Sequence, residues 1–126
     1  MAFIKLLPPE GREALPVAGV IRRLRDEFEV VDADPDAGQD HVAGMIAVTL
    51  QFSDDLPGKQ ERLAWLQSVQ EEAVYVSFGD ELGLVASCCV MPDSGLFFDS
   101  PDELNGPARP LVERAADALG YTVFEG

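Results

Sequence analysis

Four aspartates with alternating spacing are the residues of this chain that look most like a metal site: Asp32, Asp34, Asp36 and Asp40. Counted from the first, they match the positions at which an EF-hand loop places oxygen ligands around calcium. That loop also needs a glycine and a bidentate glutamate, and this chain has Ala37 and Ala43 at those places. The pattern favours a strand end followed by a helix cap over a calcium site, so we expect neither a metal nor a cofactor.

Other residue types that support catalysis are scarce. His41 is the single histidine, so an imidazole metal cage would need a second subunit. The sequence contains no glycine-rich phosphate loop and no nucleophile elbow. Two acidic pairs, Asp54–Asp55 and Asp80–Glu81, stand among turn-forming residues and would act together only if a cleft joined them. A small enzyme that uses carboxylates, with or without a divalent cation, is therefore the alternative interpretation.

The charge of the chain is strongly negative and unevenly distributed. Its 126 residues hold 23 acidic and 9 basic side chains, for a net charge of −14. Residues 26–58 contain nine acidic residues and no Lys or Arg, whereas residues 1–25 have a net charge of +3. A negative field attracts basic partners and repels nucleic acid and anionic membranes. We therefore expect a basic protein partner or self-association, without nucleic acid or membrane.

Two further features are candidates for protein contact. Trp65 lies at the margin of a predicted helix stripe, where it either closes the core or anchors a partner. Three arginines form the one basic group of an acidic chain, and a contact between them and the aspartate segment of a second copy is physically plausible. The candidate partner-binding residues are Asp32, Asp34, Asp36, Asp40, Trp65, Arg22, Arg23 and Arg25, and no residue is assigned a catalytic role.

The first elements of the fold follow from periodicity. Residues 2–7 and 28–33 read as strands, with a helix starting at Pro16 between them. The helix is indicated by apolar residues at helical spacing, namely Val17, Val20, Ile21, Leu24 and Phe28. A strand, helix, strand order of this length predicts a right-handed parallel crossover.

Residues 42–52 fit two structures. Asp34 and Pro35 form a helix start, which predicts a helix that runs to about Phe52. Ile46, Val48, Leu50 and Phe52 also alternate with other residues as they would in a strand. The start signal favours the helix.

The second half of the chain is predicted to begin with a helix over residues 59–73 and to continue with strands over 73–78, 84–91 and 96–99. The tight connections between these strands predict a three-stranded antiparallel meander, and the apolar run 84–91 indicates its central strand. A helix ending at Gly120 and a strand over 121–124 complete the chain. Cys88 and Cys89 are adjacent in a strand, so they point to opposite faces and are expected to be free thiols.

The predicted fold is α+β: a single domain over residues 1–126, built as a two-layer α/β sandwich on a mixed sheet of five or six strands. No stretch approaches the roughly 20 apolar residues of a bilayer span, and the N-terminal residues lack the features of a signal peptide, so we expect a cytoplasmic protein. The function that these observations favour is a non-catalytic protein-interaction module, either an inhibitor or accessory protein for a basic partner or a homodimer.

Overall fold

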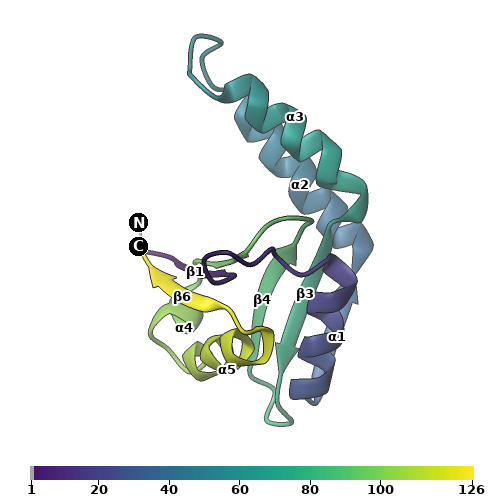
Figure 1. The fold of residues 1–126 in the computed structure, drawn as a ribbon, viewed down its shortest axis with the longest axis vertical. Helices are drawn as coiled ribbons and strands as arrows, with labels where there is room; N and C mark the ends of the chain where they lie inside the picture. The colour runs from purple at the N-terminus through teal and green to yellow at the C-terminus, as the bar shows by residue number, and fades with distance from the viewer. Residues whose placement is uncertain (1) are drawn as a thin grey trace.

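The structure is a computed structural model that describes residues 2–126. Within these residues the chain forms five α-helices, a 3₁₀ turn (η1, Gln70–Glu72) and two three-stranded antiparallel sheets, which confirms the predicted α+β class. Figure 1 shows that both sheets and three of the helices gather at one end of the long axis, while two helices extend away from them. No helix within these residues is both long and apolar enough to cross a bilayer.

One sheet has the strand order β5–β1–β6, in which β1 is Ile4–Leu7, β5 is Leu96–Phe98 and β6 is Thr122–Glu125. Ile4 stands opposite Phe98 on one side and Glu125 on the other. Alternate residues of β1 and β5 are buried, so one face of this sheet closes the main core.

The other sheet has the order β2–β3–β4, in which β2 is Val30–Asp34, β3 is Val74–Gly79 and β4 is Val85–Val90. One of its faces packs in the main core with α1 (Val17–Glu27) and α5 (Arg109–Leu119). The predicted apolar stripe of α1 is on that side, because Val20, Leu24 and Phe28 are all buried there.

The predicted single mixed sheet is wrong, because the strands belong to two separate antiparallel sheets. Since β1 and β2 lie in different sheets, α1 is no parallel crossover between them. The meander is broken too, because β5 pairs with β1 instead of β4. β4 is an edge strand, and its apolarity comes from cover on both faces: Cys88 lies in the main core and Cys89 in a second cluster.

The free edge of β4 is closed by a buried glutamate. Glu103 of the short helix α4 (Pro101–Leu104) accepts a hydrogen bond from the backbone N–H of Ser87 at 2.7 Å. Its burial, only partly offset by backbone hydrogen bonds, raises the pKa of the Glu103 carboxyl. The carboxylate thus satisfies one backbone donor of edge strand β4, so that this N–H is not left free to pair with a further strand.

Residues 35–50 are helical, so the favoured alternative is confirmed. Asp34 accepts a hydrogen bond from the N–H of Ala37 at 3.0 Å and caps α2 (Pro35–Leu50) as predicted. Gly38 lets this helix lie directly against β3, since a Cβ there would come within 2.5 Å of the Ala73 carbonyl oxygen.

The two cysteines are free and buried, as expected. Burial raises the pKa of both thiols, that of Cys89 to about 11. Both therefore remain protonated, and unreactive, near neutral pH.

Candidate protein-contact surface

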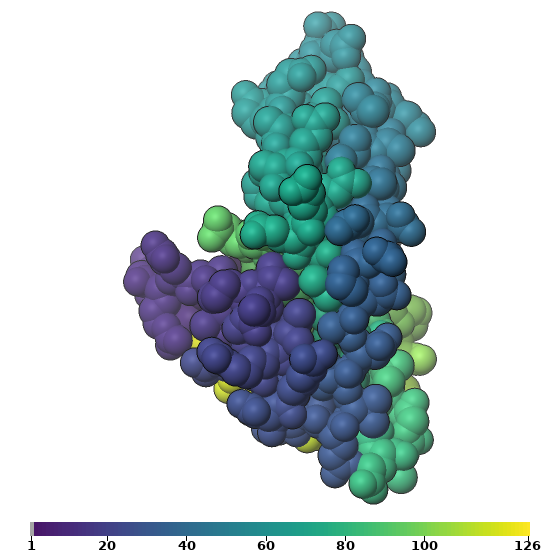
Figure 2. Space-filling view, turned by 90° about the vertical axis from the view of Figure 1, so that its right-hand side faces the viewer, coloured from purple at the N-terminus to yellow at the C-terminus, as the bar shows by residue number. Residues whose placement is uncertain are grey.

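The feature that departs most from an ordinary compact fold is a projecting helical hairpin. α2 continues past the sheet, and α3 (Lys59–Val69) returns beside it. We call residues 42–69 the arm and the remaining described residues the body. In Figure 1 the arm extends beyond the sheets, and Figure 2 shows it standing clear of the N-terminal part of the body.

The tip of the arm is tied together by a buried lysine. Lys59 is only 5% exposed, and its Nζ donates hydrogen bonds to the carbonyl oxygens of Phe52 (2.8 Å) and Leu50 (3.4 Å). These carbonyls belong to the last turn of α2 and the loop after it, where helical partners run out. Lys59 also contacts Asp54 at 2.6 Å, and this hydrogen bond and charge lower the pKa of the Asp54 carboxyl. The tip is therefore an ordered turn.

The arm buries four large apolar side chains, Val42, Leu63, Leu66 and Val69, and leaves a larger set exposed. Its contribution to the second cluster comes from one row, with Val42 and Leu66 at the centre. Large apolar side chains elsewhere on the arm are exposed, from 36% for Trp65 to 58% for Leu50; the full set is Val48, Leu50, Phe52, Leu56 and Trp65. A helix that is apolar on several sides is normally buried on several sides. The arm thus has an apolar surface that the rest of the described chain does not cover.

A shallow groove of about 420 Å³ runs along one side of the arm. Its floor is apolar and includes Gly44, Met45 and Val48 of α2, with His41 and Asp40 toward the body. Arg62 of α3 borders it and donates a hydrogen bond to the Thr49 hydroxyl at 3.1 Å. The groove is open at Gly44, because a Cβ added there would meet no atom of the described residues within 4 Å.

Trp65 stands three residues after Arg62, so it lies on the same side of α3 as the groove. Its side chain is 36% exposed and belongs to neither core cluster, so its role as a partner contact stays a prediction. Asp40, another predicted contact residue, lines the groove. The structure therefore brings these two predicted residues to the arm and its base.

The other predicted contact residues lie on the body. Asp32, Asp34 and Asp36 are at the end of β2 and the start of α2, where Asp34 serves as the cap. Within residues 2–126 no group of three His, Cys, Asp or Glu side chains is arranged to hold a metal ion. The arginines Arg22, Arg23 and Arg25 are exposed on α1, where Arg23 donates a hydrogen bond to the Ala118 carbonyl.

The two acidic pairs that could have formed a catalytic site are far apart. Asp54 and Asp55 belong to the tip of the arm, whereas Asp80 and Glu81 belong to the turn between β3 and β4. Figure 1 places these two segments at opposite ends of the molecule. One cleft in the described part of the chain therefore cannot hold both pairs.

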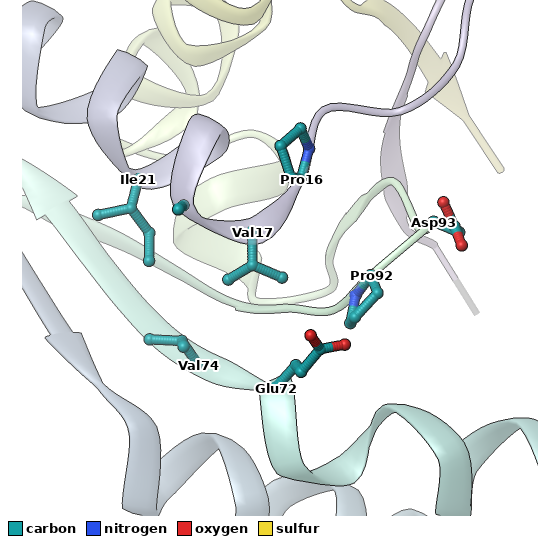
Figure 3. Close-up of a pocket in the computed structure, with 8 residues that line it drawn as sticks. Pro16, Val17, Ile21, Glu72, Val74, Pro92 and Asp93 are labelled. Atoms are coloured by element: carbon teal, nitrogen blue, oxygen red, sulfur yellow. The ribbon is translucent and has the colours of Figure 1, made fainter.

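A second hollow of about 490 Å³ lies on the body, between α1 and β3 (Figure 3). Val17, Ile21 and Val74 supply an apolar lining, and Glu72 and Asp93 lie on the side away from Ile21. Among the described residues, no lysine or arginine lines this hollow. Its chemistry would suit an apolar side chain next to a basic one.

Sequence reasoning missed two parts of the arm. The buried lysine was not anticipated, because a lysine at a helix start normally lies in water. The exposure of the apolar residues was missed as well, although residues 42–53 carry no charged residue, which is the signal that could have revealed it. Comparisons of this chain with protein-family models, with curated proteins and with solved structures gave no match, so its function is argued from this geometry alone.

Proposed function

We propose that this chain is a non-catalytic protein-interaction module and that the arm is its contact surface. The observation that carries the proposal is the exposure of five large apolar side chains on a hairpin that stands clear of the body. The 28 residues of the arm thus expose five large apolar side chains, whereas the other 97 described residues expose six, namely Val30, Leu82, Leu84, Val85, Phe97 and Phe124. Such groups scattered singly need no explanation, but a concentration of them on one projecting element is typical of a binding surface.

The charge distribution supports the same proposal. The arm holds three acidic residues, Asp54, Asp55 and Glu61, and two basic residues, Lys59 and Arg62. Lys59 and Asp54 form the ion pair at its tip. The net charge of the arm is thus −1, so −13 of the chain's −14 belongs to the rest of the molecule. Protein contact surfaces are depleted of charge at their centre and surrounded by a polar rim. The arm, with few charged residues, has the composition of such a centre. The acidic residues at its base and on the body would form the polar rim.

The partner is a basic protein, which the field of the body attracts, or a second copy of the chain. The carboxylate enzyme is the alternative. It has no comparable observation in its favour, because its candidate acids are separated along the molecule.

A site-specific photocrosslinking experiment tests the proposal and works with an unidentified partner. A photoreactive phenylalanine derivative is placed at Val48 on the arm and, as a matched control, at Leu82, which is 85% exposed in the β3–β4 turn. Irradiation of cells that express each variant should give one discrete crosslinked species from position 48 and none from position 82. No product at position 48, or the same products from both positions, would refute the arm as the contact surface.

A further inference from the structure

We propose that the arm binds a second copy of this chain, with the two arms packed antiparallel around a two-fold axis as a four-helix bundle. This inference rests on the proposed function, since it names the partner of the same surface. Three observations carry it: the charge contrast between arm and body, the direction in which the arm projects, and the groove beside Gly44.

Charge decides which parts of two copies can meet. Two bodies of net charge −13 repel each other, whereas two arms of net charge −1 barely interact electrostatically. A contact through the arms therefore avoids the repulsion that two acidic surfaces of the bodies would experience.

The direction of the arm decides the orientation. The arm extends from one end of the body (Figure 1). If two arms packed parallel, the bodies would lie side by side and their charges would repel. In an antiparallel pair each tip approaches the base of the other arm, and the bodies lie at opposite ends. A closed two-fold arrangement of this kind also uses the same surface on both copies.

The shape of the arm supplies the fit. The groove is open at Gly44, toward the base of the arm, and the exposed side chains of Phe52 and Leu56 are at the tip. In an antiparallel pair the tip of one copy reaches the groove of the other, so that an exposed apolar side chain enters an open apolar hollow. Val48, near the middle of the free part of α2, then lies close to the two-fold axis.

The size of the arm limits the affinity. A contact between two short hairpins falls in the class that buries less than about 1,200 Å² in total, which is typical of weak or transient complexes. We therefore expect a dissociation constant on the order of 10 µM.

A different self-contact makes the opposite prediction about salt. If Arg22, Arg23 and Arg25 of one copy bound the Asp32 to Asp40 segment of another, added salt would screen the attraction and weaken association. If the arms carry the contact, salt screens the repulsion between the bodies and strengthens association. The sign of the salt dependence separates the two surfaces.

Sedimentation equilibrium of the purified full chain, from about 1 to 300 µM at low and high salt, tests this inference. We expect a monomer–dimer equilibrium that tightens several-fold with salt. Val48→Asp and Trp65→Ser should each weaken it at least tenfold, whereas Leu82→Asp should leave it unchanged; thermal melts verify that all three variants fold.

If the chain stays monomeric at all concentrations, the inference that a second copy is the partner is overturned. The proposed function is tested separately, because a discrete crosslink from position 48 to another protein would still support it. A dimer that resists both arm variants, or that weakens with salt, places the contact elsewhere and overturns the inference.

Cysteine crosslinking tests the orientation separately. The native thiols are buried and unreactive, so a single introduced cysteine reports its own surroundings. Under mild oxidation Val48→Cys should form a disulfide-linked dimer, because it lies near the axis, whereas Leu56→Cys at the tip should not. A disulfide-linked dimer from Leu56→Cys would show parallel arms, in which each residue lies opposite its own copy, and would overturn the antiparallel arrangement.

Discussion

The arm and the body use apolar side chains in different ways. In the body, large residues such as Phe78, Phe98 and Leu24 are fully buried between two sheets and two helices. In the arm, one row of side chains is buried while Val48 and Leu50 are more than half exposed. The body also exposes apolar side chains, such as Leu82 and Phe97, but these surround an enclosed core. Burial is what stabilises a fold, so the exposed residues of the arm contribute little to folding. The comparison indicates that the body holds the structure and that the arm presents a surface.

The largest effect that separates the two regions is expected from core truncation. Phe78→Ala removes a fully buried ring that contacts Phe28 and Phe98, and it should lower the free energy of unfolding by about 3–5 kcal/mol. Val48→Ala should change it by no more than about 0.5 kcal/mol, because that side chain is exposed. Urea denaturation of both variants measures the difference. Equal losses would show that the arm is part of the core.

Two glycines on α2 sharpen the comparison within one helix. Gly38→Ala would force a Cβ against the Ala73 carbonyl and should cost about 1–3 kcal/mol. Gly44→Ala meets no neighbouring atom of the described residues and should stabilise the monomer by about 0.5–1 kcal/mol through helix propensity. Thermal melts at low protein concentration show whether each variant raises or lowers the melting temperature. Destabilisation by both variants would mean that the groove is already filled.

The aspartate segment is expected to divide into a cap and a solvated surface. Asp34→Ala removes the hydrogen bond to Ala37 and should cost about 1 kcal/mol. Changing Asp32, Asp36 and Asp40 together to Asn should alter stability only slightly, because these side chains lie at the surface. Denaturant titration compares the two variants. A large loss of stability in the triple variant would show that those three acids are structural. If Asp34→Ala lost no more stability than the triple variant, Asp34 would not act as a cap.

The smallest effect concerns the pH response of the tip. The hydrogen bond and charge of Lys59 hold the pKa of Asp54 below its ordinary value of 3.8. A carboxyl pKa that is lower in the folded state adds stability to the fold. This stability is fully present at pH values above the pKa of the unfolded state, and it is lost as the pH falls through the pKa of the folded state. An NMR titration of the Asp54 carboxyl should thus give a midpoint below 3.8, which returns to that value in Lys59→Met. An unchanged midpoint would exclude the contact in solution.

The sequence predicted those parts of the fold that local chemistry determines. The apolar spacing of α1, the cap at Asp34 and the free thiols were all identified, because each depends on residues close together in the chain. Strand partners were not identified. β1 pairs with β5 and β6, about ninety or more residues away, and an apolar strand contains no local signal for its neighbour.

The candidate site was predicted only in part. Charge patterning pointed to Asp32 through Asp40 and to the arginines of α1. Of the predicted contact residues, the structure places Trp65 on the arm and Asp40 in the groove at its base. The remaining features depend on how far α2 extends past the sheet and on the burial of Lys59. Both are properties of tertiary packing, so periodicity within the helix could not reveal them.

Hydrogen–deuterium exchange of the purified chain at increasing protein concentration tests most directly whether the arm is a contact surface. Amides near Gly44 to Leu50 and in α3 should be weakly protected in dilute solution and gain protection as the concentration rises, while β3 and α1 stay unchanged. Protection that rises instead at Arg22 to Arg25 and Asp32 to Asp40, with the arm unchanged, would contradict this account.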